Sequence, residues 1–155
     1  MGAGKTVVGR ELAKITGRRF IDTDEMIERQ QKISVEAIFK VYCEDYFRDL
    51  EHGVCREISL LKNCVVSTGG GTLTFERNVE LFKGKDRIVF LDASFDTICE
   101  RLGDSDSRPL FNDREQARAL YEQRRALYEA ASDISVDGDM SARKTALTLA
   151  QLLKN

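Results

Sequence analysis

Residues 1–6 read MGAGKT, and this stretch decides which fold the rest of the sequence has to complete. Gly4, Lys5 and Thr6 form the second half of the motif G-x-x-x-x-G-K-[ST], a phosphate-binding loop that joins a buried strand to a helix. Consecutive backbone N–H groups of such a loop surround phosphates at the helix N-terminus, where the helix dipole also favours anions. The first glycine of the motif and the strand before it are not in the sequence. On these residues alone, a glycine-rich helix start without a ligand is an open alternative.

Length and composition describe one ordinary globular domain. A chain of 155 residues suits a single domain, 1–155, with a substantial core. The net charge of −2 argues against nucleic acid or a membrane surface as the main partner. The sequence has no signal peptide and no apolar run of ~18 residues, and its four cysteines form no C-x-x-C pair. We therefore expect a reduced, cytoplasmic protein without a zinc or thioredoxin-type site.

Helical and strand patterns alternate along the chain, which predicts a three-layer α/β fold with a largely parallel sheet flanked by helices. Residues 5–16 read as a helix with Val8, Leu12 and Ile15 on one face and Gly17 as its stop. In the helical stretch 34–62 the side chains expected to point inward are Phe47, Leu50, Val54, Ile58 and Leu61. Strands are expected at 18–22, 64–67, 87–91 and 133–136, and one more immediately before residue 1.

Two carboxylates follow the first of these strands. Asp22 and Asp24 stand two positions apart, at the carboxyl end of a strand in a parallel sheet, where ligand crevices form. One of them is suited to hold Mg²⁺ through water, and the other to accept a proton from an alcohol during phosphoryl transfer. The alternative is a helix N-terminus with acidic residues, which is common.

Three consecutive glycines follow the strand at 64–67. Gly69, Gly70 and Gly71 cost backbone entropy, which predicts a close approach of a ligand to bare backbone, although a plain flexible turn is the alternative. Arginines are spread among these motifs, at Arg48, Arg108, Arg124 and Arg125. A guanidinium binds a carboxylate through two hydrogen bonds, so the set indicates an anionic substrate, while a single arginine is usually a solvated surface group.

Motifs spread over the whole chain resemble, in order and spacing, those of the shikimate kinase family. They are GAGKTVVGRELA (2–13), FIDTDEMIE (20–28), SVEAIF (34–39), FRDLE (47–51), STGGG (67–71), SRPL (107–110) and RRALYEAASDISVD (124–137). The resemblance implies transfer of the ATP γ-phosphoryl group to the 3-hydroxyl of shikimate, giving shikimate 3-phosphate and ADP in aromatic amino acid biosynthesis. It also implies the P-loop fold of nucleoside monophosphate kinases, a five-stranded parallel sheet with a substrate-binding subdomain and a moving lid.

The strand missing before residue 1 is the central one in that family's sheet. Without it, two neighbouring strands lose hydrogen-bond partners, and each unsatisfied buried backbone group costs ~1–3 kcal/mol against a total stability of ~5–15 kcal/mol. We therefore expect a chain that begins at residue 1 to be unstable, and the natural product to begin further upstream.

On the nucleotide side, the resemblance implies that the loop at 2–7 binds the ATP phosphates, with Lys5 taking part in catalysis. The loop residues are Gly2, Ala3, Gly4, Lys5, Thr6 and Val7. Thr6 resembles the family's ligand of Mg²⁺, and Asp22 resembles the residue that binds the ion through water. Arg101 resembles the residue that lies against adenine. Arg108 resembles the catalytic lid arginine that contacts the phosphates, in a lid at 104–114.

On the substrate side, the resemblance implies a shikimate-binding subdomain at 24–53. Asp24 resembles the residue that binds the shikimate hydroxyls and acts as catalytic base. Arg48 and Arg124 match the arginines that bind the shikimate carboxylate. The backbone of the glycine turn, Gly69, Gly70 and Gly71, matches the remaining substrate contacts. The chain is expected to be a monomer, with neither nucleic acid nor membrane as a partner.

The chain departs from the family pattern at three places: the leading glycine and strand are absent, Val7 replaces a hydroxyl residue common in the family, and Ala126 replaces its usual proline.

The sequence leaves two other functions open. One is a kinase-like protein that binds ligands but is inactive through its shortened N-terminus. The other is a related small-molecule kinase such as a gluconate kinase.

Overall fold

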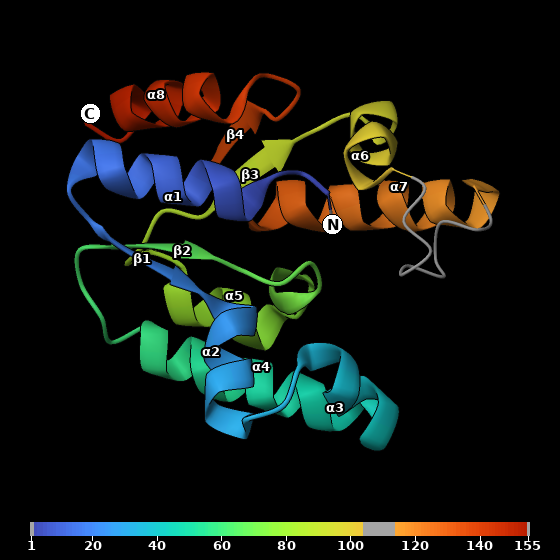
Figure 1. The fold of residues 1–155 in the computed structure, drawn as a ribbon. Coiled ribbons are helices and arrows are strands. Elements are labelled where there is room, and N and C mark those ends of the chain that lie inside the picture. Colours follow the sequence, from blue (N-terminus) through green and yellow to red (C-terminus); the bar gives the residue numbers. More distant parts are fainter. Residues whose placement is uncertain (1, 104–113, 155) are drawn as a thin grey trace.

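The computed structural model describes residues 2–103 and 114–154 of the chain. Helices and strands alternate through most of it (Figure 1). The elements are α1 (Lys5–Thr16), β1 (Arg19–Asp22), α2 (Thr23–Gln31), α3 (Val35–Val41), α4 (Glu44–Ile58), β2 (Cys64–Ser67), the 3₁₀ helix η1 (Thr72–Thr74), α5 (Glu76–Phe82), β3 (Val89–Asp92), α6 (Phe95–Leu102), α7 (Arg114–Ala131), β4 (Ile134–Asp137) and α8 (Ala142–Leu152). The α/β fold with parallel strands is confirmed.

The described strands form two parallel pairs. β1 pairs with β2 from Arg19↔Cys64 to Asp22↔Ser67, and β3 pairs with β4 from Val89↔Ile134 to Asp92↔Asp137. Because the paired strands run parallel, Asp22 and Ser67 end their strands side by side. This register brings the loop after β1 next to the glycine turn after β2.

A cavity of about 350 Å³ lies between the two strand pairs, lined among others by Val65 of β2, Val89 of β3 and Leu12 of α1. The two pairs are separate sheets rather than one four-stranded sheet.

The core has two parts, one on each side of that cavity. The part below the β1–β2 pair in Figure 1 is formed with α2, α3, α4 and α5, and its buried members are Ile21, Ile27, Ile38, Phe47, Val54, Cys55, Ile58, Phe82 and Ile88. The other part lies between α1, α8 and the β3–β4 pair, and its buried members are Val8, Leu12, Leu91, Val136, Ala146, Leu149 and Ala150. The helix α1 also packs against β1 and β2, so the loop that opens it lies between the two parts.

Two residues expected in the core are on the surface, Ile15 and Leu61, each 41% exposed. Successive helix residues rotate by about 100°, so the buried face of α1, which includes Gly9, Leu12 and Ala13, leaves Ile15 at its edge. The helix α4 ends at Ile58, and Leu61 therefore no longer lies on its apolar face.

In the part of the chain that the structure describes, no helix is long and apolar enough to cross a membrane.

Candidate active site

The phosphate-binding loop is built at the N-terminus of α1. Gly2 and Gly4 have φ of 70° and 83°, a left-handed backbone that glycine adopts without strain. The first intrahelical bond runs from the Val8 N–H to the Gly4 carbonyl at 2.9 Å. A side chain at Gly2 would lie 2.9 Å from Ile98 Cγ2 of α6, so both the backbone angle and the packing require glycine there.

A cavity of about 670 Å³ opens beside this loop. Its wall contains the loop itself, the carboxylates Asp22 and Asp24 after β1, and the turn after β2. A second, more apolar pocket shares Lys5, Gly69 and Gly70 with the first and extends to Arg124 and Tyr128 of α7. The fold therefore brings the phosphate-binding loop, Asp24, Gly69, Gly70 and Arg124 to these two neighbouring cavities, whereas Arg48 and Gly71 line neither of them.

Thr6 and Asp22 face each other across the loop. The Thr6 hydroxyl donates to Asp22 Oδ2 at 3.0 Å and lies 3.4 Å from the Ser67 hydroxyl. The other carboxylate oxygen of Asp22 accepts the backbone N–H of Asp24 at 3.0 Å and caps α2. Asp22 is thus held in place by the helix that it starts.

Oxygen donors of this kind fit Mg²⁺, which takes one or two protein ligands and completes its shell with phosphate and water. Among the described residues, no group of three or more His, Cys, Asp and Glu side chains is clustered to hold a metal. The chemistry of Thr6 and Asp22 therefore suits a magnesium ion that arrives with a nucleotide, rather than one in a cage of protein ligands.

Asp24 occupies an unfavourable place for a charge. Its Oδ1 is buried and has no hydrogen-bond partner among the described residues. Burial, followed by the negative charges of Asp22 and Glu51, raises the pKa of Asp24 from 3.8 to about 6, and Lys5 opposes this rise. A carboxylate whose pKa is raised toward neutrality is suited to accept a proton.

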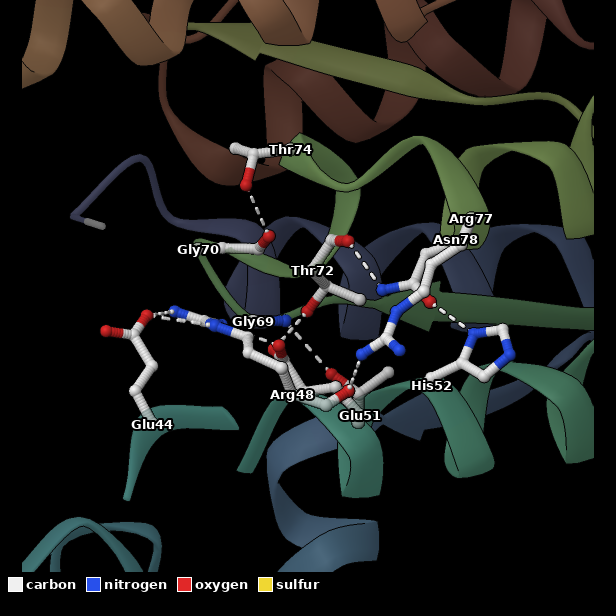
Figure 2. Close-up of polar contacts among 12 residues, drawn as sticks. Glu44, Arg48, Glu51, His52, Gly69, Gly70, Thr72, Thr74, Arg77 and Asn78 are labelled. Atoms are coloured by element: carbon white, nitrogen blue, oxygen red, sulfur yellow. Dashed lines mark hydrogen bonds and ion pairs between the residues drawn. The ribbon is translucent and has the colours of Figure 1, made fainter. Parts of the chain in front are cut away.

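Arg48 lies on α4 with its side chain only 13% exposed (Figure 2). Its Nη1 donates to Glu51 Oε2 at 2.5 Å, and its Nη2 donates to Glu44 Oε1 at 2.8 Å. Gly71 makes room for the guanidinium, because a Cβ at this position would lie 2.6 Å from Nη1. The third glycine of the turn is therefore explained by Arg48 itself.

The glycine turn also packs against Asp24 and α7. The Gly69 N–H donates to Thr23 Oγ1 at 2.9 Å, and a Cβ on Gly69 would lie 2.8 Å from Asp24 Oδ1. From α7, the Tyr128 hydroxyl donates to the Gly70 carbonyl. Close packing therefore requires glycine at Gly69 and Gly71, where the neighbours are side chains of this protein, and the expected approach of a ligand to this backbone stays a prediction.

Arg124 and Arg125 on α7 have different surroundings. Arg125 forms two hydrogen bonds to Asp92 at the end of β3, from Nε at 2.9 Å and from Nη2 at 2.7 Å. Burial raises the pKa of the Tyr128 hydroxyl, and the positive charges of Arg124 and Arg48 oppose that rise. The two arginines predicted to bind the substrate carboxylate thus both lie close enough to Tyr128 for their charges to act on its pKa, although they come from helices far apart in the sequence.

Arg101 on α6 lies over the phosphate-binding loop. Its Nη1 donates to the Ala3 carbonyl at 3.2 Å and its Nη2 to the Met140 carbonyl at 3.4 Å. It lines the larger cavity together with the loop. Residues 104–113, which include Arg108 and nearly all of the expected lid, lie outside the described residues.

Three residues of this site were not predicted from the sequence: Glu51, Thr72 and Tyr128. Glu51 was detectable in part, because an acidic residue three positions after an arginine on a helix commonly pairs with it. Neither Thr72 nor Tyr128 carries a sequence signal of its own. Their contacts depend on how α4 and α7 pack on the glycine turn.

Comparisons with known proteins agree with this arrangement. A family model described as shikimate kinase matches residues 1–154. The shikimate kinase of Helicobacter hepaticus is 38% identical over 149 residues, which are 94% of this chain and 87% of that protein. The shikimate kinase of Aquifex aeolicus is 36% identical over 140 residues, which are 90% of this chain and 83% of that protein.

Solved structures give the same result. The shikimate kinase from Acinetobacter baumannii in complex with shikimate matches this fold with a TM-score of 0.92 and 34% identity, covering 99% of this chain and 88% of that one. The crystal structure of the Aquifex aeolicus enzyme matches with a TM-score of 0.89 and 33% identity, covering 99% of this chain and 92% of that one. With the phosphate-binding loop, the buried Asp24 and the glycine turn in place, the chain belongs to the shikimate kinase family.

Proposed function

We propose that this protein transfers the γ-phosphoryl group of ATP to the 3-hydroxyl of shikimate, producing shikimate 3-phosphate and ADP. The observation that carries the proposal is the position of Asp24. Its Oδ1 is buried beside the glycine turn, and the residue lines the same cavity as Lys5 and the phosphate-binding loop. A base, an anion-binding loop and a substrate pocket are the parts that phosphoryl transfer to an alcohol needs.

The substrate carboxylate would bind to Arg48 and Arg124. A planar guanidinium matches a carboxylate through two parallel hydrogen bonds, and a partly buried one binds more strongly than an exposed one. The hydroxyl groups of shikimate would bind to Asp24 and to the backbone of Gly69, Gly70 and Gly71. Together these groups recognise a small molecule with one carboxylate and several hydroxyls.

The nucleotide would bind along the opposite wall of the cavity. The backbone N–H groups from Gly2 to Val7 and the Lys5 ammonium would hold the phosphates, and Arg101 would lie against the adenine. Thr6 Oγ1 would ligate Mg²⁺ directly and Asp22 through water. When bound, the ion neutralises charge on the phosphate oxygens.

In the reaction, Asp24 accepts the proton of the 3-hydroxyl as that oxygen forms its bond to the γ-phosphorus. The bond between this phosphorus and the bridging oxygen breaks, and ADP leaves with the bond's electron pair. Lys5 would stabilise the negative charge on the transferred phosphoryl group, and Arg108 of the expected lid would supply a second positive charge there. Exclusion of water from the closed site would prevent hydrolysis of ATP in place of transfer.

A coupled assay of ADP release tests the proposal. With ATP and Mg²⁺ present, we expect rapid ADP release only when shikimate is added, and little release with gluconate. Turnover of gluconate in place of shikimate would identify another small-molecule kinase. Binding of both ligands without turnover would favour the inactive, ligand-binding alternative.

The cytoplasmic location, the monomeric state and the division into a subdomain at 24–53 and a lid at 104–114 stay predictions. Gel filtration of the purified protein with light scattering decides the oligomeric state.

A further inference from the structure

Thr72, the residue directly after the three glycines, is completely buried at 0% exposure. Its hydroxyl donates to Glu51 Oε1 at 2.7 Å, and Glu51 is itself 1% exposed (Figure 2). The other oxygen of Glu51 accepts from Arg48 Nη1. A buried carboxylate is stable only when its oxygens are hydrogen-bonded, and here each oxygen has a different partner.

Asn78 of α5 holds Thr72 in this position. Asn78 is 1% exposed, and its Nδ2 donates to the Thr72 carbonyl at 2.8 Å. Its Oδ1 lies 2.8 Å from His52 Nδ1 of α4, so one carboxamide joins the glycine turn to the helix that carries Arg48. The neighbouring Arg77 adds a second connection, from its Nη2 to the Arg48 carbonyl at 2.9 Å.

The hydrogen bonds of Arg48 show why its orientation matters. A guanidinium has five N–H donors. Among the described residues, Glu44 accepts from Nε and Nη2, and Glu51 accepts from Nη1. This leaves one N–H on each of the two terminal nitrogens for a further acceptor such as the substrate carboxylate.

We propose that Thr72 and Asn78 are positioning residues for the substrate carboxylate, acting on Arg48 through Glu51. Neither touches the substrate. The Thr72 hydroxyl donates a hydrogen bond to Glu51 Oε1, and this bond prevents the Glu51 carboxylate from rotating. The other oxygen, Oε2, therefore faces Arg48 Nη1. Asn78 keeps the Thr72 backbone at the distance that this bond requires. The inference rests on the proposed role of Arg48 in binding the carboxylate of shikimate.

The test compares Thr72→Val, which removes the hydroxyl and keeps the shape, with Thr72→Ser, which restores it. For Thr72→Val we expect the KM for shikimate to rise about tenfold, as for the loss of a buried hydrogen bond to a charged group. The KM for ATP and kcat should change little. Thr72→Ser should return the KM for shikimate close to its original value.

Asn78→Asp provides a second, independent variant. It keeps an acceptor toward His52 but places an oxygen against the Thr72 carbonyl, where Asn78 has its N–H donor. We expect it also to raise the KM for shikimate and not the KM for ATP. The matched control is Thr145→Val, because Thr145 of α8 is equally buried at 1% exposure and its hydroxyl bonds to the Ser141 carbonyl at 3.2 Å.

A purely structural role for Thr72 predicts a different result. Thr72→Val and Thr145→Val would then lower the melting temperature alike, and both would leave the KM for shikimate unchanged, which overturns the inference. A rise in both KM values with a fall in kcat overturns it as well. Arg48→Ala, measured in parallel, distinguishes failure of the positioning role from failure of the proposed role of Arg48. If Arg48→Ala raises the KM for shikimate and Thr72→Val does not, only the positioning role of Thr72 fails. If neither variant raises this KM, the assignment of Arg48 to the substrate carboxylate fails as well.

Discussion

Asp24 and Gly71 show how single residues determine the chemistry of this site. Asp24 carries a carboxylate that burial and three neighbouring acids push toward the neutral form. Gly71 matters because it has no side chain where Arg48 needs space. One residue thus acts through its charge and the other through its small volume.

Replacing Asp24 by Asn removes the proton acceptor and keeps the size of the side chain. We expect kcat to fall by about 10²–10⁴-fold, the usual contribution of a general base. Nucleotide binding, measured by calorimetry with ADP and Mg²⁺, should persist because the phosphate-binding loop is unchanged. A variant with normal kcat would contradict the role of Asp24 as base.

Replacing Gly71 by Ala places a Cβ within 2.6 Å of Arg48 Nη1, so the guanidinium has to move. We expect a clear rise in the KM for shikimate. The control is Gly53→Ala in the middle of α4, where a Cβ meets no atom within 4 Å. That change should leave KM unaffected and stabilise the protein by roughly 0.5–1 kcal/mol, because alanine is the better helix former. An unchanged KM in the Gly71 variant would show that Arg48 adapts without loss.

At the scale of elements, α7 and the loop after β4 connect the site to the strand ends. Arg125 attaches α7 to Asp92 of β3, and Tyr128 attaches the same helix to the glycine turn. Arg124 directly precedes the first of these two attachments in sequence. The helix α7 is therefore held in place at two positions, and these determine where Arg124 lies.

Removal of Arg124 should act on one substrate only. For Arg124→Ala we expect the KM for shikimate to rise by about 10–100-fold, as for the loss of hydrogen bonds between charged partners. The KM for ATP should change far less. Arg118→Ala on the same helix is the control, because its side chain is 54% exposed and surface changes rarely matter. Equal increases in both KM values would count against the assignment of Arg124.

Asp139 in the loop after β4 gives the fold a pH-dependent connection. Its Oδ1 accepts the Ser94 backbone N–H at 2.8 Å, next to the start of α6, and this bond lowers the pKa of Asp139 below its ordinary value of 3.8. A lowered pKa means that the ionised form stabilises the folded state above 3.8, and that this contribution is lost as the pH falls through the lowered pKa. The melting temperature of Asp139→Asn should therefore decrease less on acidification than that of the unaltered protein. Parallel acid curves would contradict this.

At the scale of the whole molecule, the two core parts coincide with the two sides of the site. The part with α2, α3, α4 and α5 carries Arg48 and the glycine turn. The part with α1, α8, β3 and β4 carries the phosphate-binding loop. A cavity separates them where the strand pairs do not meet. A ligand that contacts both parts should consequently stabilise the entire fold.

Ligand binding should therefore raise the melting temperature. Shikimate at a hundred times its Kd is expected to stabilise the protein by about 2.7 kcal/mol through mass action. ADP with Mg²⁺ should give a separate increase, and Arg124→Ala should reduce the first increase while keeping the second. Thermal denaturation with each ligand alone and with both measures these effects. The absence of any shift with shikimate would contradict the proposed substrate.

Much of the fold could be predicted from the sequence because its signals are local. The bounds of α1 agree with the prediction, since Gly4 and Gly17 both adopt left-handed backbones that other residues rarely take. Ser34 and Ser94 cap α3 and α6 through their own hydroxyl groups, and serine is among the residue types that most often start helices. Ile15 and Leu61 were placed wrongly because the exposure of a helix position depends on what packs against it.

The sequence by itself determined that this chain has a phosphate-binding loop, an aspartate at the strand end and a glycine turn, because each is a pattern of neighbouring residues. Only the tertiary structure decided how these parts combine. The hydrogen bonds from Thr72 to Glu51 and from Tyr128 to Gly70 join residues that are far apart along the chain. Such contacts form when helices pack on the strand ends, and no local pattern specifies which side chains will then meet.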